Sequence, residues 1–241
     1  MIVPIGLFAV AIVPIGLFAV AIVPIVRRGA ASPAVRASRA VAVLVVRVVA
    51  VTGAETVRIV GGKHKGAALA GPKSMAIRPT TDRLRESLFN ILAHAYGDPV
   101  TEARVLDLFS GTGALGLEAL SRGARFCLFV EDGIEGRGLI RRNVETLQAT
   151  GHTKLWRRDA TKLGAIEAQT PFDLVFADPP YGKGLGDKAI ASAVAGGWLA
   201  PEALIVLEET ADVEIEIPAG LELLETRDFG DSKVWFIRNG R

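Results

Sequence analysis

The chain has 241 residues, half of them hydrophobic, which suits one α/β domain with a sizeable core and additional segments. Its net charge of +2 is uneven, because residues 1–50 contain five arginines and no acid, which leaves 23 basic and 26 acidic residues for the rest. Residues 51–241, with this charge balance, are not a general polyanion binder. The one cysteine cannot form an internal disulfide. The three histidines are scattered and lack the spacing of a metal site.

Residues 1–50 form a leading segment that differs in composition from the rest. Residues 2–11 read IVPIGLFAVA, and this unit is repeated unchanged and then begun a third time. The uncharged stretch over residues 2–26 is long enough to span a bilayer, and the arginines after it would favour an inside flank. A perfect repeat is nevertheless typical of a recent DNA duplication. We therefore interpret residues 1–50 as an over-extended gene start or a dispensable extension before Val51, with a membrane anchor as the alternative.

Residues 51–77 predict a small basic β-hairpin. Residues 57–60 have the pattern of a short strand, GGKHKG is a glycine-framed basic turn, and residues 67–72 can return as the second strand.

The remaining residues, 78–241, predict a doubly wound α/β domain. A helix over 78–95, capped by Thr80 or Thr81, precedes an alternation of apolar strands and helices that a terminal hairpin closes. The predicted strands are 104–109, 124–131, 153–159, 172–178, 203–209, 221–230 and 233–238, and the predicted helices are 113–123, 134–149, 160–168 and 184–198. The closing antiparallel hairpin is typical of the Rossmann-like class I methyltransferase fold, so we expect a seven-stranded, mostly parallel sheet plus the small N-terminal hairpin.

A glycine-rich loop joins the first strand of this domain to its helix. Ser110, Gly111 and Gly113 lie in a segment that permits a tight turn and close approach of the backbone to a ligand. The Gly-x-Gly-x-x-Gly spacing also fits a dinucleotide site. Asp107 favours S-adenosylmethionine, because a carboxylate there can meet a sulfonium or ammonium group and is a poor neighbour for a pyrophosphate. Glu131 ends the second strand, where an acid can bind the ribose of either ligand.

Asp159 ends the third strand, and Ala160 follows it. Two compatible roles are open for Asp159. It can accept a hydrogen bond from an adenine amino group in the ligand site, or it can cap the helix predicted over residues 160–168.

The tetrapeptide Asp178-Pro-Pro-Tyr181 follows the apolar strand FDLVFA. Two consecutive prolines are stiff and would hold a fixed turn beside the ligand. Asp178 and the carbonyl of Pro179 can each accept a hydrogen of an exocyclic base amine and aim its lone pair at a methyl group, while Tyr181 offers a stacking face. The pattern predicts direct methyl transfer to a base amine. The adjacent Lys183, between two glycines, is either part of a mobile basic loop or of a flexible helix start.

With these motifs, the chain from Val57 to about Arg238 resembles the RsmD-type bacterial methyltransferases, which act on guanine N2 of small-subunit ribosomal RNA (guanine 966). The resemblance rests on RIVGG at 58–62, RPTTDRLRESLFN at 78–90, FSGTGALGLEALSRG at 109–123 and the Asp-Pro-Pro-Tyr tetrapeptide. The second motif is the most specific. In place of the Glu-x-Asp that such proteins often have after the second strand, this chain has Glu131-Asp132-Gly133, which puts a role for Asp132 in doubt.

The resemblance implies a role for several residues. S-adenosylmethionine would be bound by Asp107, Gly111, Gly113, Glu131 and Asp159, the guanine would be held by Asp178 and Tyr181, and the donor and RNA side would be shaped by Arg78, Thr80, Arg83 and Arg85.

Residues 58–85 contain seven basic residues and one acid, Asp82. On a body with net negative charge this stretch is the natural phosphate-facing surface, and a solvated face with an arginine capping network is the alternative. The residues predicted to bind RNA are Arg58, Lys63, Lys65, Arg78, Arg83, Arg85 and Lys183.

The expected protein is a cytoplasmic, monomeric enzyme without a metal or an obligatory protein partner. It would methylate guanine N2 of 16S ribosomal RNA within a small-subunit particle. An N6-adenine or N4-cytosine DNA methyltransferase shares the Asp-Pro-Pro-Tyr chemistry, although residues 57–77 are short for a DNA-reading domain. A protein-amide methyltransferase would usually place Asn before the prolines. A catalytically silent RNA-binding assembly factor and a scaffold anchored through residues 2–26 are the remaining alternatives.

Overall fold

The computed structural model describes residues 57–72, 81–167 and 169–240, all within one compact unit, Ala54–Arg241. The predictions for residues 1–50, Arg78 and Thr80 lie outside the described residues. No helix among the described residues is long and apolar enough to cross a membrane.

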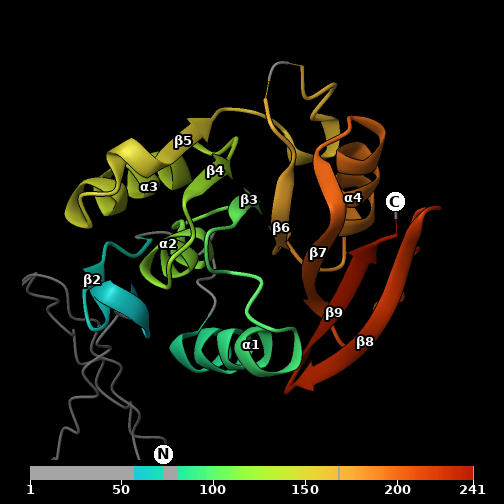
Figure 1. Ribbon diagram of the computed structural model, residues 1–241, viewed down its shortest axis with the longest axis horizontal. Coiled ribbons are helices and arrows are strands. Elements are labelled where there is room, and N and C mark those ends of the chain that lie inside the picture. Colours follow the sequence, from blue (N-terminus) through green and yellow to red (C-terminus); the bar gives the residue numbers. More distant parts are fainter. Residues whose placement is uncertain (1–56, 73–80, 168, 241) are drawn as a thin grey trace, which may run out of the picture. The chain divides into compact units, whose positions relative to one another are not determined.

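A seven-stranded sheet forms the centre of this unit, in the order β5-β4-β3-β6-β7-β9-β8 (Figure 1). The strands β3 to β7 are parallel, whereas β9 pairs antiparallel with β7 and with β8. The predicted fold class is confirmed. The strands are β3 (Arg104–Leu108), β4 (Phe126–Val130), β5 (Thr153–Trp156), β6 (Phe172–Ala177), β7 (Leu199–Thr210), β8 (Leu221–Phe229) and β9 (Ser232–Asn239).

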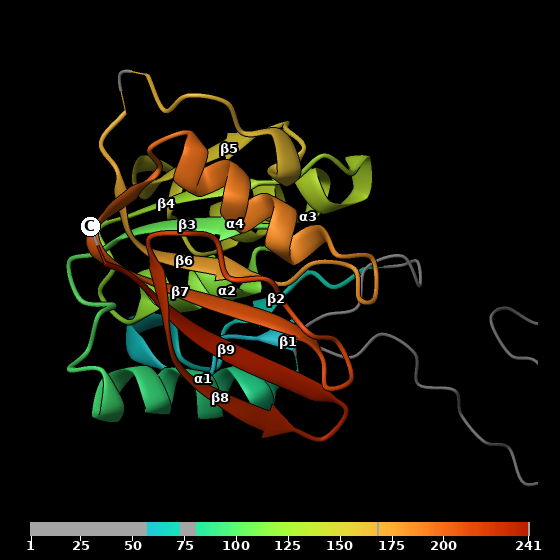
Figure 2. The same cartoon turned by 90° about the vertical axis from the view of Figure 1, so that its right-hand side faces the viewer.

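Helices cover both faces of the sheet, and α1 and α4 lie on opposite sides of it (Figure 2). One face carries α1 (Asp82–Ala95), α2 (Ala114–Ser121) and α3 (Ile134–Thr146). The other face carries α4 (Leu185–Ala195) and the short 3-10 helix η3 (Ala160–Lys162). In the sheet, β3 has β4 on one side and β6 on the other. The direction in which successive strands are added therefore reverses between β3 and β6. Ligands of open α/β sheets bind at such a switch point.

The predicted N-terminal hairpin is present as β1 (Val57–Arg58) and β2 (Ala68–Leu69), joined by the 3-10 helix η1 (Gly62–His64). Buried polar side chains of α2 and α3 bind its backbone. Glu118 Oε2 accepts from the Val60 amide at 2.8 Å, and Asn143 Oδ1 accepts from the Ala70 amide at 2.6 Å. At the tip, Ser121 Oγ donates to the Gly61 carbonyl at 2.6 Å.

Two helix predictions need correction. In the helix predicted over 160–168, the described residues 160–167 form only η3, because after it the chain turns at Gly164, whose φ is +73°, and the Leu163 amide donates to Ser192 Oγ at 2.8 Å. The helix predicted over 184–198 ends at Ala195, since Gly197 adopts a φ of +73° and β7 begins at Leu199. The cap of α1 is Thr81, whose Oγ1 accepts from the Leu84 amide at 3.2 Å. A third 3-10 helix, η2 (Thr150–His152), precedes β5.

Candidate functional site

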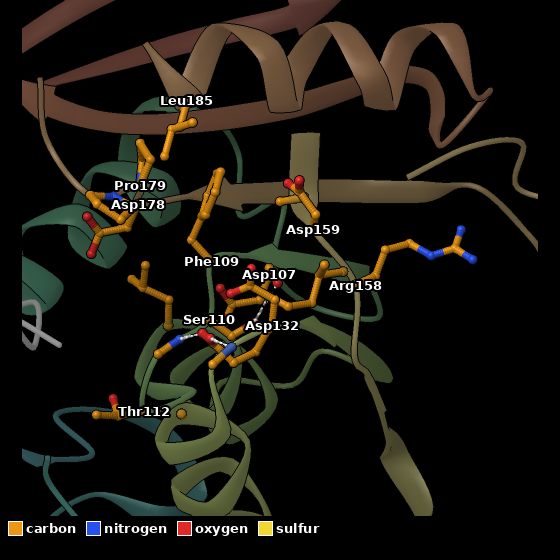
Figure 3. Close-up of a pocket in the computed structure, with 18 of the residues that line it drawn as sticks. Asp107, Phe109, Ser110, Thr112, Asp132, Arg158, Asp159, Asp178, Pro179 and Leu185 are labelled. Carbon is orange, nitrogen blue, oxygen red and sulfur yellow. Dashed lines mark hydrogen bonds between the residues drawn. The ribbon is translucent and has the colours of Figure 1, made fainter. Parts of the chain in front are cut away.

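A cavity of about 680 Å³ opens at the carboxyl ends of the parallel strands, at the switch point of the sheet (Figure 3). We call it the glycine-loop cavity. Its walls come from the segments that follow β3, β4, β5 and β6, which are far apart in sequence and adjacent in the sheet. The predicted site residues in its lining are Asp107, Ser110, Gly111, Glu131, Asp159, Ala160, Asp178, Pro179 and Tyr181.

The glycine loop has the backbone that its sequence predicts. Gly111 and Gly113 have φ values of +53° and +78°, and the Gly113 amide donates to the Ser110 carbonyl at 2.6 Å. Gly113 does not line the cavity. The third glycine, Gly116, allows α2 to lie close to the sheet, since a Cβ there would be 2.5 Å from Cys127 Sγ and from the Phe129 ring.

Asp107 is a buried carboxylate at the floor of this cavity, with 2% of its surface exposed. Its Oδ2 accepts from the Gly116 amide at 3.0 Å. Burial raises the pKa of Asp107 to about 7, against the hydrogen bond from Gly116, and the nearby charge of Glu131 adds to the rise. A cation bound beside it would restore the charged form.

Glu131 joins the loops that follow the neighbouring strands β3 and β4, both of which line the cavity. Its Oε2 accepts from the Gly111 amide at 2.8 Å and its Oε1 from the Gly133 amide at 2.7 Å. Burial raises the pKa of Glu131, although both hydrogen bonds favour the charged form. Gly136 lies close behind, where a Cβ would be 2.7 Å from Glu131 Cδ. A carboxylate oxygen has two lone pairs, so each oxygen retains acceptor capacity for a ligand hydroxyl.

Asp159 performs the capping role and also faces the cavity. Its Oδ1 accepts from the Thr161 amide at 2.9 Å and from the Thr161 hydroxyl at 2.7 Å, and these bonds lower the pKa of Asp159. The structure therefore contains one of its two expected roles, as the cap of η3, and Asp159 also lines the cavity, with its Oδ2 4.0 Å from Lys162 Nζ.

The Asp-Pro-Pro-Tyr turn is held by two acids at the end of β7. The Tyr181 hydroxyl donates to Glu208 Oε1 at 2.6 Å and lies 3.3 Å from Ser232 Oγ. The Gly182 amide donates to Glu209 Oε1 at 2.8 Å. Both glutamates are buried. Burial and the charge of Asp178 raise the pKa of Tyr181, so its hydroxyl stays protonated and remains a donor to Glu208.

A second cavity, of about 530 Å³, adjoins the first through Asp178 and Tyr181, which line both. We call it the α1 cavity. It lies between the first turns of α1, the end of β7 and the turn between β8 and β9. Its lining residues are Thr81, Arg83, Leu84, Ser87, Asp178, Tyr181, Glu208, Asp228, Phe229, Gly230 and Ser232.

The structure separates the predicted RNA-binding residues. Arg83 lines the α1 cavity. Arg58 Nε pairs with Asp82 Oδ2 at 2.7 Å, and Lys63 lines a different cavity beside the hairpin tip. Lys65 and Lys183 are exposed and line neither the glycine-loop cavity nor the α1 cavity.

Arg85 requires a correction. Its side chain is completely buried, and its Nη2 donates to the Arg58 carbonyl and to Asp82 Oδ1, both at 2.6 Å. A guanidinium enclosed in this way has no surface for a phosphate. In the described structure Arg85 fastens the hairpin to α1 rather than binding RNA.

Comparison with known proteins identifies the family. A family profile described as "Conserved hypothetical protein 95" matches residues 57–238. The chain belongs to this family. It is 42% identical over 168 residues to ribosomal RNA small subunit methyltransferase D of Escherichia coli K12. The matched region covers 69% of this chain and 80% of that protein. The protein of the same name from Haemophilus influenzae is 34% identical over 176 residues, covering 72% and 89%.

A solved structure supports the same assignment. The Escherichia coli protein yhhF has a TM-score of 0.66 and 33% identity, over 78% of this chain and 99% of that chain. The resemblance to RsmD-type methyltransferases that the motifs indicated is confirmed.

Sequence reasoning missed three residues that line the two cavities, Ile134, Arg158 and Glu208, and a fourth, Glu209, that binds the Gly182 amide beside them. Glu208 and Glu209 were visible only as acids at a strand end, and Arg158 only as one cation in a basic stretch. Ile134 is 83% exposed and lines the glycine-loop cavity, where it offers an apolar surface at the start of α3. The sequence signal that could have identified Ile134 as a cavity residue is its position directly after the loop that contains Glu131.

Proposed function

We propose that the protein transfers a methyl group from S-adenosylmethionine to the exocyclic N2 of a guanine in 16S ribosomal RNA, at the position that corresponds to guanine 966. The observation that carries this proposal is the meeting of two cavities at Asp178 and Tyr181. One cavity has the lining for a methyl donor and the other has the lining for a base. The names of the relatives support ribosomal RNA as the substrate.

The lining of the glycine-loop cavity fits S-adenosylmethionine better than a dinucleotide. Asp107, Glu131 and Asp159 contribute carboxylates, and Asp107 is buried where an ammonium or sulfonium group would offset its desolvation. A pyrophosphate would be repelled there. The exposed side chain of Ile134 gives an apolar wall for an adenine ring. When bound, S-adenosylmethionine supplies an activated methyl group on a sulfonium.

The α1 cavity favours guanine among the bases that carry an exocyclic amine. It combines carboxylates of Asp178, Glu208 and Asp228 with the guanidinium of Arg83. Guanine presents two adjacent donors, N1–H and the N2 amine, beside the O6 acceptor. Adenine and cytosine place a ring-nitrogen acceptor beside the amine on the same edge. A carboxylate of the cavity would repel that ring nitrogen. An acceptor-rich cavity with one cation therefore matches guanine.

In the proposed reaction, Asp178 and the carbonyl of Pro179 each accept one hydrogen of the guanine amine. This directs the nitrogen lone pair toward the methyl group, and Asp178 receives the proton released when the N–C bond forms and the bond between the methyl group and the donor sulfur breaks. Tyr181 acts through its ring face, because its hydroxyl donates to Glu208. Glu209 fixes the turn through the Gly182 amide.

We further propose that the acceptor is a partly assembled small-subunit particle and that the enzyme works as a cytoplasmic monomer without a metal. A guanine within folded RNA would have to be turned out of its stack to reach the α1 cavity.

The test is methyl transfer from labelled S-adenosylmethionine to small ribosomal subunits that lack the modification, followed by digestion and mass analysis of the nucleosides. The wild-type chain should yield N2-methylguanosine, and fragment mapping should place it at the proposed position. Asp178→Ala should abolish the product and retain donor binding. Methyladenosine or methylcytosine as the product, or transfer only to DNA or protein, would refute the guanine assignment.

A further inference from the structure

The charged residues of the domain divide between the two edges of its sheet. Residues 137–162, which run through α3, β5 and η3, contain seven basic residues and two acids. Residues 199–239, which form β7, β8 and β9, contain ten acids and three basic residues. Because β5 and β8 are the two edge strands, the basic and acidic stretches lie at opposite ends of the sheet (Figure 1).

Six of the seven cations at the β5 edge are exposed, and we call them the β5 basic surface. They are Arg141, Arg142, Lys154, Arg157, Arg158 and Lys162. The seventh, Arg137, is buried and donates to the Asp132 carbonyl. Lys154 and Arg158 lie over the ring of the half-buried Trp156, with Nζ and Cζ at 5.0 Å and 5.1 Å from its centroid. Lys162 Nζ lies 4.0 Å from Asp159 Oδ2, an ion pair at the long end of the usual range.

The β5 basic surface begins at the proposed methyl-donor site. Arg158 lines the glycine-loop cavity, next to Asp159 and Thr161. Figure 3 shows its side chain at the margin of that cavity. An extended polyanion that delivers one nucleotide to Asp178 would therefore meet these cations as soon as it leaves the site.

The opposite end of this surface meets a third cavity, of about 520 Å³, beside the hairpin tip. This cavity has one carboxylate, Glu102, and several basic groups in its lining. The basic groups are Lys63, His64, Arg122, Arg125 and His152. His152 immediately precedes β5 and lines this cavity together with Lys63, so the cavity connects the hairpin tip to the β5 edge in the fold.

We propose that the β5 basic surface binds the phosphate backbone of the substrate RNA outside the target nucleotide. The RNA runs from the target nucleotide at Asp178, past Arg158 at the margin of the glycine-loop cavity, and along β5 toward the hairpin tip, where Lys63 and Lys65 extend the same surface. The acidic β8 edge repels RNA and so fixes the direction of approach. This inference rests on the proposed function for the identity of the polyanion, and it assigns the main phosphate contacts to residues outside the motifs of the family.

The matched comparison is between two double variants that remove the same charge. Lys154→Gln with Arg157→Gln changes the β5 basic surface at residues that line neither the glycine-loop cavity nor the α1 cavity. Lys188→Gln with Arg227→Gln removes two exposed cations from α4 and β8. Binding of a 16S RNA fragment is measured by fluorescence anisotropy over a range of salt concentrations, with S-adenosylmethionine affinity and thermal stability as parallel readouts.

The β5 variant should bind RNA about tenfold more weakly or worse, with the slope of log K against log salt reduced by roughly one to two. Its donor affinity and stability should match the wild type, and the control variant should bind RNA within about twofold of wild type. Equal weakening in both variants would show that only net charge matters, and would overturn the proposal.

Two other outcomes are also decisive. If the β5 variant binds naked RNA normally and loses affinity only for assembled particles, the surface binds an acidic protein and the RNA assignment is wrong. The binding assay does not depend on turnover. A wild-type chain that binds RNA but methylates none in the transfer assay would therefore refute the proposed function and leave the surface assignment standing.

Discussion

The glycine-loop cavity and the α1 cavity share two residues and are built in different ways. The walls of the first are four strand-to-helix segments at one edge of the sheet, and their main contacts are to backbone amides, such as those of Gly111, Gly116 and Gly133. The walls of the second come from α1, β7 and the β8–β9 turn, and are mostly polar side chains. The parallel sheet therefore fixes the shape of the first cavity, whereas long-range packing fixes the second.

This difference predicts distinct responses to substitution. Changes around the glycine loop should affect donor affinity and stability together, because the same backbone forms the site and the core. Changes in the α1 cavity should affect transfer and leave donor affinity and stability unaltered.

Gly116→Ala should lower the free energy of unfolding by about 2–3 kcal/mol and weaken S-adenosylmethionine binding by roughly a hundredfold. The added Cβ would be 2.5 Å from Cys127 Sγ and the Phe129 ring, so α2 and the glycine loop must shift together. Calorimetry and denaturant unfolding measure both effects. Gly138→Ala on α3 is the control, since its Cβ meets nothing within 4 Å and should be neutral or stabilising.

Glu208→Gln should reduce kcat/KM for RNA by about thirtyfold with donor affinity unchanged. It replaces the charged acceptor of the Tyr181 hydroxyl, a bond of 2.6 Å, at the junction of the cavities. Steady-state kinetics with donor titration separates the two parameters. Glu222→Gln, on the exposed part of β8, should leave both unaltered. A parallel loss of donor affinity would show that the two cavities are not independent.

Donor affinity should fall by about tenfold between pH 8 and pH 6. The pKa of Asp107 is raised to about 7, so the carboxylate is charged above that value and gains a proton below it. The neutral acid no longer attracts the cationic donor, and affinity therefore declines as pH falls. Calorimetry at several pH values measures this, and Asp107→Asn should give weak, pH-independent binding. An unchanged pH profile in that variant would assign the effect to another group.

Ile134→Ser should weaken donor binding by about fivefold and leave stability unchanged. The side chain is 83% exposed in the described structure, so its removal from the free protein costs little, and only ligand contact buries it. Leu223→Ser, at 45% exposure on β8, is the control for a loss of exposed apolar surface. A stability loss in Ile134→Ser would contradict this interpretation.

The parts of the fold and site that depend on local patterns could be predicted from the sequence. The order of strands and helices, the glycine loop and the Asp-Pro-Pro-Tyr turn are each set by a few neighbouring residues. Parallel strands bring their carboxyl ends to one edge, so Asp107, Glu131, Asp159 and Asp178 meet without any knowledge of side-chain packing.

The parts that depend on distant contacts could not be predicted in this way. Glu208 and Tyr181 are 27 residues apart and meet only because β6 and β7 are neighbours in the sheet. The burial of Arg85 could have been predicted from helical periodicity. Arg85 lies three residues before Leu88 and seven before Leu92, so it shares the buried face of α1. Arg83, two residues earlier, faces the α1 cavity instead. Charge alone did not separate these two arginines, whereas helical periodicity does.

The attachment of the β1–β2 hairpin has a consequence for exchange between relatives. Glu118 is completely buried, and its carboxylate accepts from the Val60 amide and from Arg122 Nε at 2.7 Å. A truncation that removes residues 57–72 would leave that carboxylate with Arg122 as its remaining hydrogen-bond partner among these two, would release Asn143 from the Ala70 backbone, and would expose the core surface on which Val57, Ile59 and Leu69 pack. The hairpin is thus an integral layer of the domain. A chimaera that transplants it from another species would fold only if the recipient helices carried matching residues at 118, 121 and 143.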